Sequence, residues 1–126
     1  MEVKSMSKKL LAPVAVLVFV VGIGAAVVNA MQHQGSWTGE VVDISCMVSK
    51  GAKGADHMEC GAKCVKAGLP VGLLVGDTTY ILIGADHKSM NHKLADHVSH
   101  TVTVTGTRYE SKGANIIEVS DFKMAK

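Results

Sequence analysis

The residues of this chain that are best suited to chemistry are three cysteines and one histidine that lie close together. His57, Cys60 and Cys64 follow one another at short intervals, and Cys46 precedes them. If residues 57–67 form a helix, positions i, i+3 and i+7 project from one stripe of its surface. An imidazole and two thiols then converge, and Cys46, at the end of an expected strand, can fold back onto them. The pattern predicts a single site that contains every cysteine of the chain.

A metal ion is the first interpretation of this site. The four residues make a Cys3His set, which suits a tetrahedral zinc ion. Copper(I) is the other candidate, because thiolate and imidazole donors suit a soft ion, and Met47 or Met58 then adds a thioether. We therefore expect zinc or copper as the cofactor.

A disulfide is the second interpretation, because an odd number of cysteines in an exported domain needs an explanation. An oxidising compartment favours a bond from Cys46 to Cys60 or Cys64, with the remaining thiol buried and no metal bound. A catalytic pair of cysteine and His57 is the third interpretation. No oxyanion-hole motif or third orienting residue accompanies it in the sequence, so we expect no enzymatic activity.

Three further residues have two interpretations each. Asp43 either orients a metal ligand or caps a loop at the end of its strand. His87 and His92 belong to a histidine-rich stretch. They are either surface histidines or neighbours of the cysteine site that form a secondary metal-binding patch.

The helix that carries the cysteines has its own boundary signals. Asp56 is a suitable N-cap for a helix that begins at His57, and Gly68 with Pro70 is a suitable end. These signals predict the helix independently of the cysteine spacing.

A second helix is expected later in the chain. Residues 84–87 repeat the Gly-Ala-Asp-His of residues 54–57, and the same capping chemistry predicts a helix over residues 86–97. On this helix Met90 and Leu94 face inward.

Five segments carry strand signals, which are β-branched or alternating apolar residues bounded by turn residues. They are residues 37–44, 69–75, 80–83, 100–109 and 114–119. The cysteine-bearing helix is inserted after the first strand, and the second helix lies between the third and fourth strands. This order predicts a mainly β fold with short helices (α+β), a small five-stranded OB-like Greek-key barrel.

Residues 1–30 have the character of an export segment. Three lysines precede an uncharged apolar stretch over residues 10–28, and Ala30 ends a run of small residues that suits a signal peptidase. The apolar stretch is also nearly long enough for an uncleaved membrane anchor, which needs roughly 20 residues. In both cases we expect the remainder in the periplasm or on the outer face of the cytoplasmic membrane. That remainder comprises a tether, residues 31–36, and the folded domain, residues 37–126.

The charge of the exported part excludes one class of function. Residues 1–30 hold three of the thirteen Lys and Arg and one of the eleven Asp and Glu, so the remainder carries ten of each. Its aromatic residues are Trp37, Tyr80, Tyr109 and Phe122. A neutral domain with few aromatic rings is unlike a nucleic-acid-binding protein, which has a basic face with stacking rings.

Four motifs together resemble a group of small exported bacterial proteins with an OB-like barrel. The motifs are Gly39-x-Val41-Val42-Asp43-x-x-Cys46, His57-x-x-Cys60-x-x-x-Cys64, Gly68-x-Pro70-x-Gly72-Leu73-Leu74 and Val102-Thr103-Val104-Thr105-Gly106-Thr107. The resemblance covers nearly all of the chain after the export segment. It implies the fold and an extracytoplasmic location, and it brings no established activity.

Two functional hypotheses follow. In the first, the exported domain binds one metal ion through Cys46, His57, Cys60 and Cys64, for metal handling or for its own stability. In the second, the domain is a non-catalytic accessory subunit of a membrane or envelope complex, possibly a redox complex, with a disulfide in place of the metal. Retention of residues 1–30 as a membrane anchor belongs to the second hypothesis.

Overall fold

The computed structural model describes residues 32–126, and the expected export segment lies outside this range. The strands are β1 (Gln32–Asp43), β2 (Val71–Val75), β3 (Thr78–Gly84), β4 (Thr101–Ser111) and β5 (Ala114–Met124). The helices are α2 (Ile44–Lys50), α3 (Met58–Lys66) and α4 (Asn91–Leu94), and the 3-10 turns are η1 (Ala55–His57) and η2 (Ala95–His97). No helix in this part of the chain combines the length and the apolar character needed to cross a membrane.

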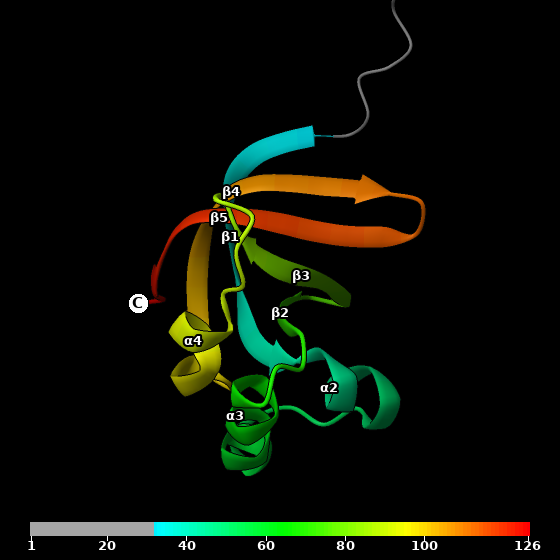
Figure 1. The fold of residues 1–126 in the computed structure, drawn as a ribbon, viewed down its shortest axis with the longest axis vertical. Coiled ribbons are helices and arrows are strands. Elements are labelled where there is room, and N and C mark those ends of the chain that lie inside the picture. Colours follow the sequence, from blue (N-terminus) through cyan, green and yellow to red (C-terminus); the bar gives the residue numbers. More distant parts are fainter. Residues whose placement is uncertain (1–31) are drawn as a thin grey trace, which may run out of the picture.

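The strands close into a barrel in the order β1-β2-β3-β5-β4. The β3–β5 pair is parallel, and the other neighbouring pairs are antiparallel. The mainly β class is confirmed, and the closed five-stranded barrel is consistent with the expected OB-like fold. α2 and α3 lie between β1 and β2 in the chain and α4 lies between β3 and β4, and all three gather at one end of the barrel (Figure 1).

The first strand is longer than expected. Residues 32–36, which we expected to be a tether, belong to β1 and pair with β4, from Gln32 opposite Tyr109 to Ser36 opposite Thr105. The Ser36 and Thr105 hydroxyls lie 2.8 Å apart across this pair. Residues 32–36 are polar. They still form a strand because their backbone groups pair with the edge of β4, and this pairing does not require their side chains to be buried.

The helices differ from expectation at their starts. Asp56 is not the N-cap of the cysteine helix, because residues 55–57 form the 3-10 turn η1 and α3 begins at Met58. Gly68, with φ of 102°, ends the helix as predicted. The second helix begins at Asn91 and not at Asp86, because the Asp86 carboxylate accepts the Lys88 N–H (3.1 Å) and closes a local turn.

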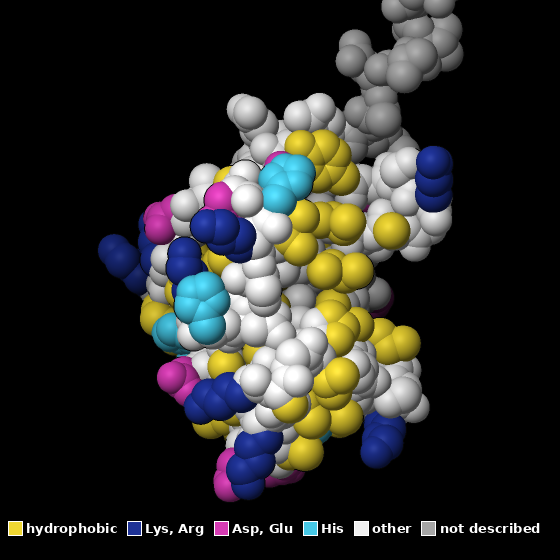
Figure 2. All heavy atoms as spheres, viewed as in Figure 1, with side chains coloured by type: hydrophobic (Ala, Val, Ile, Leu, Met, Phe, Trp, Pro, Cys, Tyr) yellow, Lys and Arg dark blue, Asp and Glu magenta, His cyan; other side chains and the backbone are white. Residues whose placement is uncertain are grey.

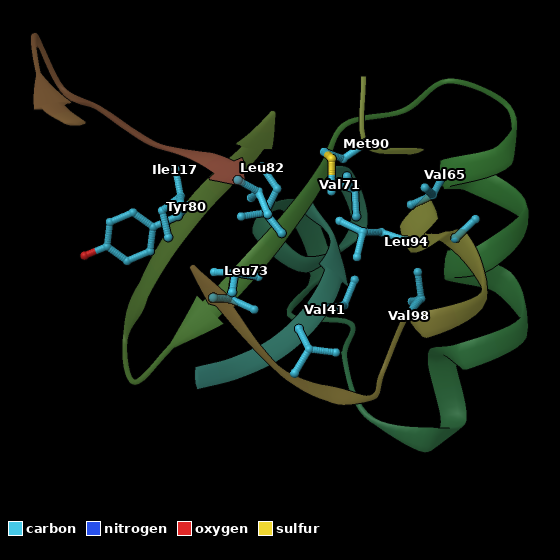
Figure 3. Packing of buried hydrophobic residues seen from close by; sticks show 14 residues of the cluster. Val41, Val65, Val71, Leu73, Tyr80, Leu82, Met90, Leu94, Val98 and Ile117 are labelled. Atoms are coloured by element: carbon cyan, nitrogen blue, oxygen red, sulfur yellow. The ribbon is translucent and has the colours of Figure 1, made fainter. Parts of the chain in front are cut away.

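One apolar core runs from the barrel into the space beneath the helices. Figure 3 shows Val65, Leu94 and Val98 pointing toward one another between α3 and the α4–η2 segment, and each is 0–1% exposed. Leu73 and Ile117, both 0% exposed, occupy the barrel interior. Full burial of each such side chain stabilises the fold by about 1.5–3 kcal/mol. The core therefore fixes α3 against the barrel end, where the cysteines lie.

Candidate metal centre

Asp43 is the centre of the candidate site. It is the last residue of β1, and it is 0% exposed. Its Oδ1 accepts the Ser45 N–H (3.0 Å) and caps the first turn of α2. Its Oδ2 is buried and has no hydrogen-bond partner. Oδ1 is thus used to cap α2, and Oδ2 is available to bind a ligand.

Cys46 lies one turn into α2, beside this carboxylate. Asp43, as hydrogen-bond acceptor for the thiol, is the main cause that raises the pKa of Cys46, and burial raises it further. A thiol is a weak donor, so Asp43 Oδ2 still lacks a hydrogen bond of ordinary geometry. The metal-free arrangement therefore favours a protonated thiol.

His57 also lies close to Asp43. Its backbone N–H donates to Gly54 O (3.0 Å), and Gly54 is tied to the barrel by Ser99 Oγ, which donates to the same carbonyl (2.7 Å). The imidazole is 14% exposed, and its Nε2 lies 3.6 Å from Asp43 Oδ2. That contact is an ion pair only when the imidazole is protonated, and Nε2 has no hydrogen-bond partner.

Gly61 makes room for this imidazole on α3. A Cβ atom at Gly61 would lie 3.2 Å from His57 Cδ2 and 2.7 Å from Val98 Cγ1. Real Cβ atoms do not come as close as the second of these distances. The small residue therefore lets the ring lie against the helix and face Asp43.

Together, Asp43, Cys46 and His57 form a compact set of potential ligands. One ligand atom from each residue lies within 4.8 Å of the other two. A buried polar atom without a partner costs about 1–3 kcal/mol, and this set holds two such atoms, Asp43 Oδ2 and His57 Nε2. A bound cation would satisfy both atoms at once.

The other two cysteines lie on α3. Cys64 is half-buried, and burial, followed by the charge of Asp43, raises its pKa to about 11. Cys60 is exposed. All three cysteines are free thiols, so the structure contains neither of the disulfides considered as an alternative.

The structure therefore brings together Cys46 and His57 from the predicted ligand set and adds Asp43, which we expected to be a neighbour or a cap. The cap interpretation holds for Oδ1. Cys60 and Cys64, the other two predicted ligands, do not belong to the compact set. The sequence signal for Asp43 is its position three residues before Cys46 at a strand end, where a fully buried carboxylate is unusual.

The secondary candidates lie in different surroundings. Met47 is half-buried and Met58 is 37% exposed, and both adjoin the site in sequence. The His87 side chain is 76% exposed and its Nε2 lies 3.4 Å from Glu118 Oε1. His92 is exposed. Neither histidine belongs to the compact set.

Carboxylate oxygen, thiolate sulfur and imidazole nitrogen are all ligands that zinc accepts, at about 2.0–2.3 Å. Ligands of one ion lie closer together than 4.8 Å, so a small contraction of the set would accompany binding. Loss of the thiol proton would supply the thiolate.

Comparison with known proteins adds no assignment: no protein-family model, no curated protein and no solved structure matches this chain.

Proposed function

We propose that the chain is an exported domain that binds one transition-metal ion, zinc or copper, through Asp43, Cys46 and His57, with Cys64 as the fourth ligand. The observation that carries the proposal is the pair of buried polar atoms without partners, Asp43 Oδ2 and His57 Nε2, beside the Cys46 thiol. Buried polar atoms without partners lower the stability of the fold, and a ligand that binds both atoms removes that loss.

The donor set favours zinc over copper(I). A carboxylate is a hard donor, whereas copper(I) prefers sulfur ligands. Zinc accepts oxygen, nitrogen and sulfur in one tetrahedral site. Cys64 lies outside the compact set, and we choose it as the fourth ligand because it is half-buried, whereas Cys60 is exposed.

The role that we infer is metal handling or stabilisation, and not catalysis. A catalytic cysteine needs a lowered pKa, whereas the pKa values of Cys46 and Cys64 are raised. Both thiols are therefore largely protonated near neutral pH until a metal displaces the protons.

The test is elemental analysis of the natively purified protein together with a count of free thiols. We expect about one equivalent of zinc or copper, and loss of that metal in the His57→Gln variant. His92→Gln is the matched control, because it makes the same change at an exposed histidine. A metal-free wild-type protein with only one free thiol would overturn the proposal in favour of a disulfide.

A second candidate is the accessory-subunit role in an envelope or membrane complex. Its support is exposed apolar surface: Val48 on α2 is 70% exposed, and Figure 2 shows hydrophobic side chains gathered on the side of β3 and α2. A photo-crosslinker at position 48 in native envelopes should give adducts that one at the exposed Lys53 does not. Equal labelling at both positions would contradict this candidate.

A further inference from the structure

We propose that two copies of this chain pair through the first half of β1, residues 32–38, which we call the β1 edge. The two strands run antiparallel about a two-fold axis, so the sheets of both copies join into one. The inference is independent of the metal centre, because none of the proposed ligands lies within residues 32–38.

The β1 edge has a neighbouring strand on one side only. β1 pairs with β4 from Gln32 to Glu40, whereas it pairs with β2 only from Glu40 to Asp43. Among the strands of residues 32–126, none lies on the other side of the β1 edge, and Figure 1 shows the start of β1 as the outermost strand beside β4. β2 thus closes the barrel against the second half of β1 and leaves the first half with an open edge.

The hydrogen bonds of β1 show which backbone groups face this open edge. The N–H and C=O of one residue in a strand point to the same side, and those of the next residue point to the opposite side. Val41 N–H donates to the carbonyl of His100, which precedes β4 (2.9 Å), and β1 pairs with β4 without a register shift. The N–H and C=O groups of Gln34, Ser36 and Thr38 therefore point away from β4, toward solvent.

The sequence of the β1 edge lacks the features that keep open edges from pairing. These features are charged side chains, above all lysine, and proline. Residues 32–38, Gln-His-Gln-Gly-Ser-Trp-Thr, contain no Lys, Arg, Asp, Glu or Pro. An open edge of this kind is a template for another strand, and a second copy of the chain brings an identical one.

One antiparallel register suits two copies of this segment. It places Gly35 of both copies at the two-fold axis, Gln34 opposite Ser36, and Gln32 opposite Thr38. Residues with free backbone groups then face each other and exchange hydrogen bonds, whereas the two Gly35 residues form a non-hydrogen-bonded pair with Cα atoms about 4.5 Å apart. No cross-strand pair in this register contains Asp, Glu, Lys or Arg, so like charges do not oppose each other.

The contact consists of one pair of short strands, so the dimer should dissociate on dilution. Stable interfaces bury about 1,200–2,000 Å² of total surface, and weak reversible contacts lie below this range. We therefore expect a monomer–dimer equilibrium that can be followed between about 1 µM and 1 mM protein.

The first experiment is sedimentation velocity of the natively purified protein over this range of concentration. We expect Ser36→Pro to weaken dimerisation at least about tenfold, because proline removes an N–H at the open edge, where a strand tolerates it. Ser36→Ala is the matched control, since it loses the same hydroxyl and keeps the N–H, and it should dimerise like the wild type. Gln34→Pro repeats the test at a second position, and circular dichroism checks that each variant is folded.

The second experiment tests the register by disulfide cross-linking. In the proposed dimer the Cα atoms at position 35 of the two copies lie within the range of about 4.4–6.8 Å that a disulfide needs. Position 38 of one copy lies roughly 20 Å from position 38 of the other. We expect Gly35→Cys to give a covalent dimer on a non-reducing gel much faster than Thr38→Cys or the wild type.

Three outcomes would overturn the inference. A monomer at every concentration would exclude self-pairing, and it is the result expected if a strand of a different protein covers the β1 edge. A dimer that both proline variants leave intact would lie on another surface. Equal cross-linking of Gly35→Cys and Thr38→Cys would contradict the antiparallel register. None of these outcomes concerns the metal content, which tests the proposed function separately.

Discussion

At the scale of single residues, the two carboxylate oxygens of Asp43 have different roles. Oδ1 caps α2, and Oδ2 is buried without a partner beside His57. The two roles can be separated by substitution, because asparagine caps a helix about as well as aspartate but is a poor metal ligand.

The Asp43→Asn variant should therefore lose metal affinity and retain its fold. We expect zinc affinity, measured by competition with a chromophoric chelator, to fall by about 10- to 100-fold or more. The free energy of unfolding of the metal-free protein should change little. Asp43→Ala removes the cap as well, and should lower that free energy by about 0.5–2 kcal/mol. Equal affinity in wild type and Asp43→Asn would exclude the carboxylate as a ligand.

Tyr80 gives a prediction about pH that is independent of the metal centre. Burial, and then the hydrogen bond from its hydroxyl to Glu110 Oε1 (3.1 Å), raise the pKa of Tyr80 above its ordinary value of 10.0. The folded state thus holds this proton more tightly than the unfolded state does. The stabilisation is complete below about pH 10 and is lost as the pH rises through the folded pKa.

The measurement uses a variant with a single tyrosine. Tyr80 and Tyr109 are the two tyrosines of the chain, so ultraviolet titration of Tyr109→Phe follows Tyr80 alone. We expect its apparent pKa to lie above that of the same variant in denaturant. Glu110→Gln should move the folded value back toward 10, and a folded value at or below the denatured one would contradict the assignment.

At the scale of elements, α3 is fixed by contacts with the segment that follows β3. Asn91 Nδ2 donates to Val65 O (2.9 Å) and to Leu69 O (2.8 Å), which pairs backbone groups at the C-terminal end of α3. Val65 itself packs against Val98 and Leu94. These contacts help to set the position of His57, the N-cap residue that precedes the other end of α3.

Gly61→Ala tests how closely α3 is packed at that end. In an exposed helix this change stabilises by about 0.5–1 kcal/mol. Here the new methyl group would meet Val98 Cγ1 and the His57 ring, so we expect destabilisation by about 1–3 kcal/mol in chemical denaturation, with weaker zinc binding. Adding Val98→Ala should restore part of the stability and not the binding. A more stable Gly61→Ala protein would show that the ring is not held against the helix.

Sequence reasoning identified the elements better than their boundaries. The end of α3 at Gly68 follows from local turn chemistry, which depends on few residues. The starts of the helices were wrong because the same aspartate chemistry closes turns as well as caps. Asp86 closes a turn with Lys88 N–H, and the αL conformation of His87 (φ 61°) stops a helix there.

The candidate site was predictable in part for the same reason. The spacing of the cysteines and His57 predicted where the site lies in the chain. Which side chains can be ligands depends on how the folded chain buries them, and the spacing does not show this. Asp43 enters the site because it is fully buried at the end of β1, and the predicted ligands Cys60, which is exposed, and Cys64, which is half-buried, lie outside the compact set. Neither fact is local in the sequence.

At the scale of the whole molecule, the proposed ion would join the end of β1, α2 and the start of α3. The barrel has its own buried core, so it should remain folded without metal. With free zinc at about 100 times Kd, binding adds about 2.7 kcal/mol, which raises Tm by about 10 °C or more for a domain of this size. Calorimetry with zinc and with EDTA measures the shift. An identical Tm in both, or an unfolded protein in EDTA, would contradict this description.

The length of β1 also fixes a distance across the molecule. β1 starts at Gln32 at the pole opposite α2 and α3 and reaches Asp43 at the other pole (Figure 1). A twelve-residue strand is about 35 Å long along its path, and β1 curves between its two ends (Figure 1). If the segment that precedes Gln32 is held in a lipid bilayer, the strand acts as a rigid spacer that keeps the metal ligands clear of the headgroups.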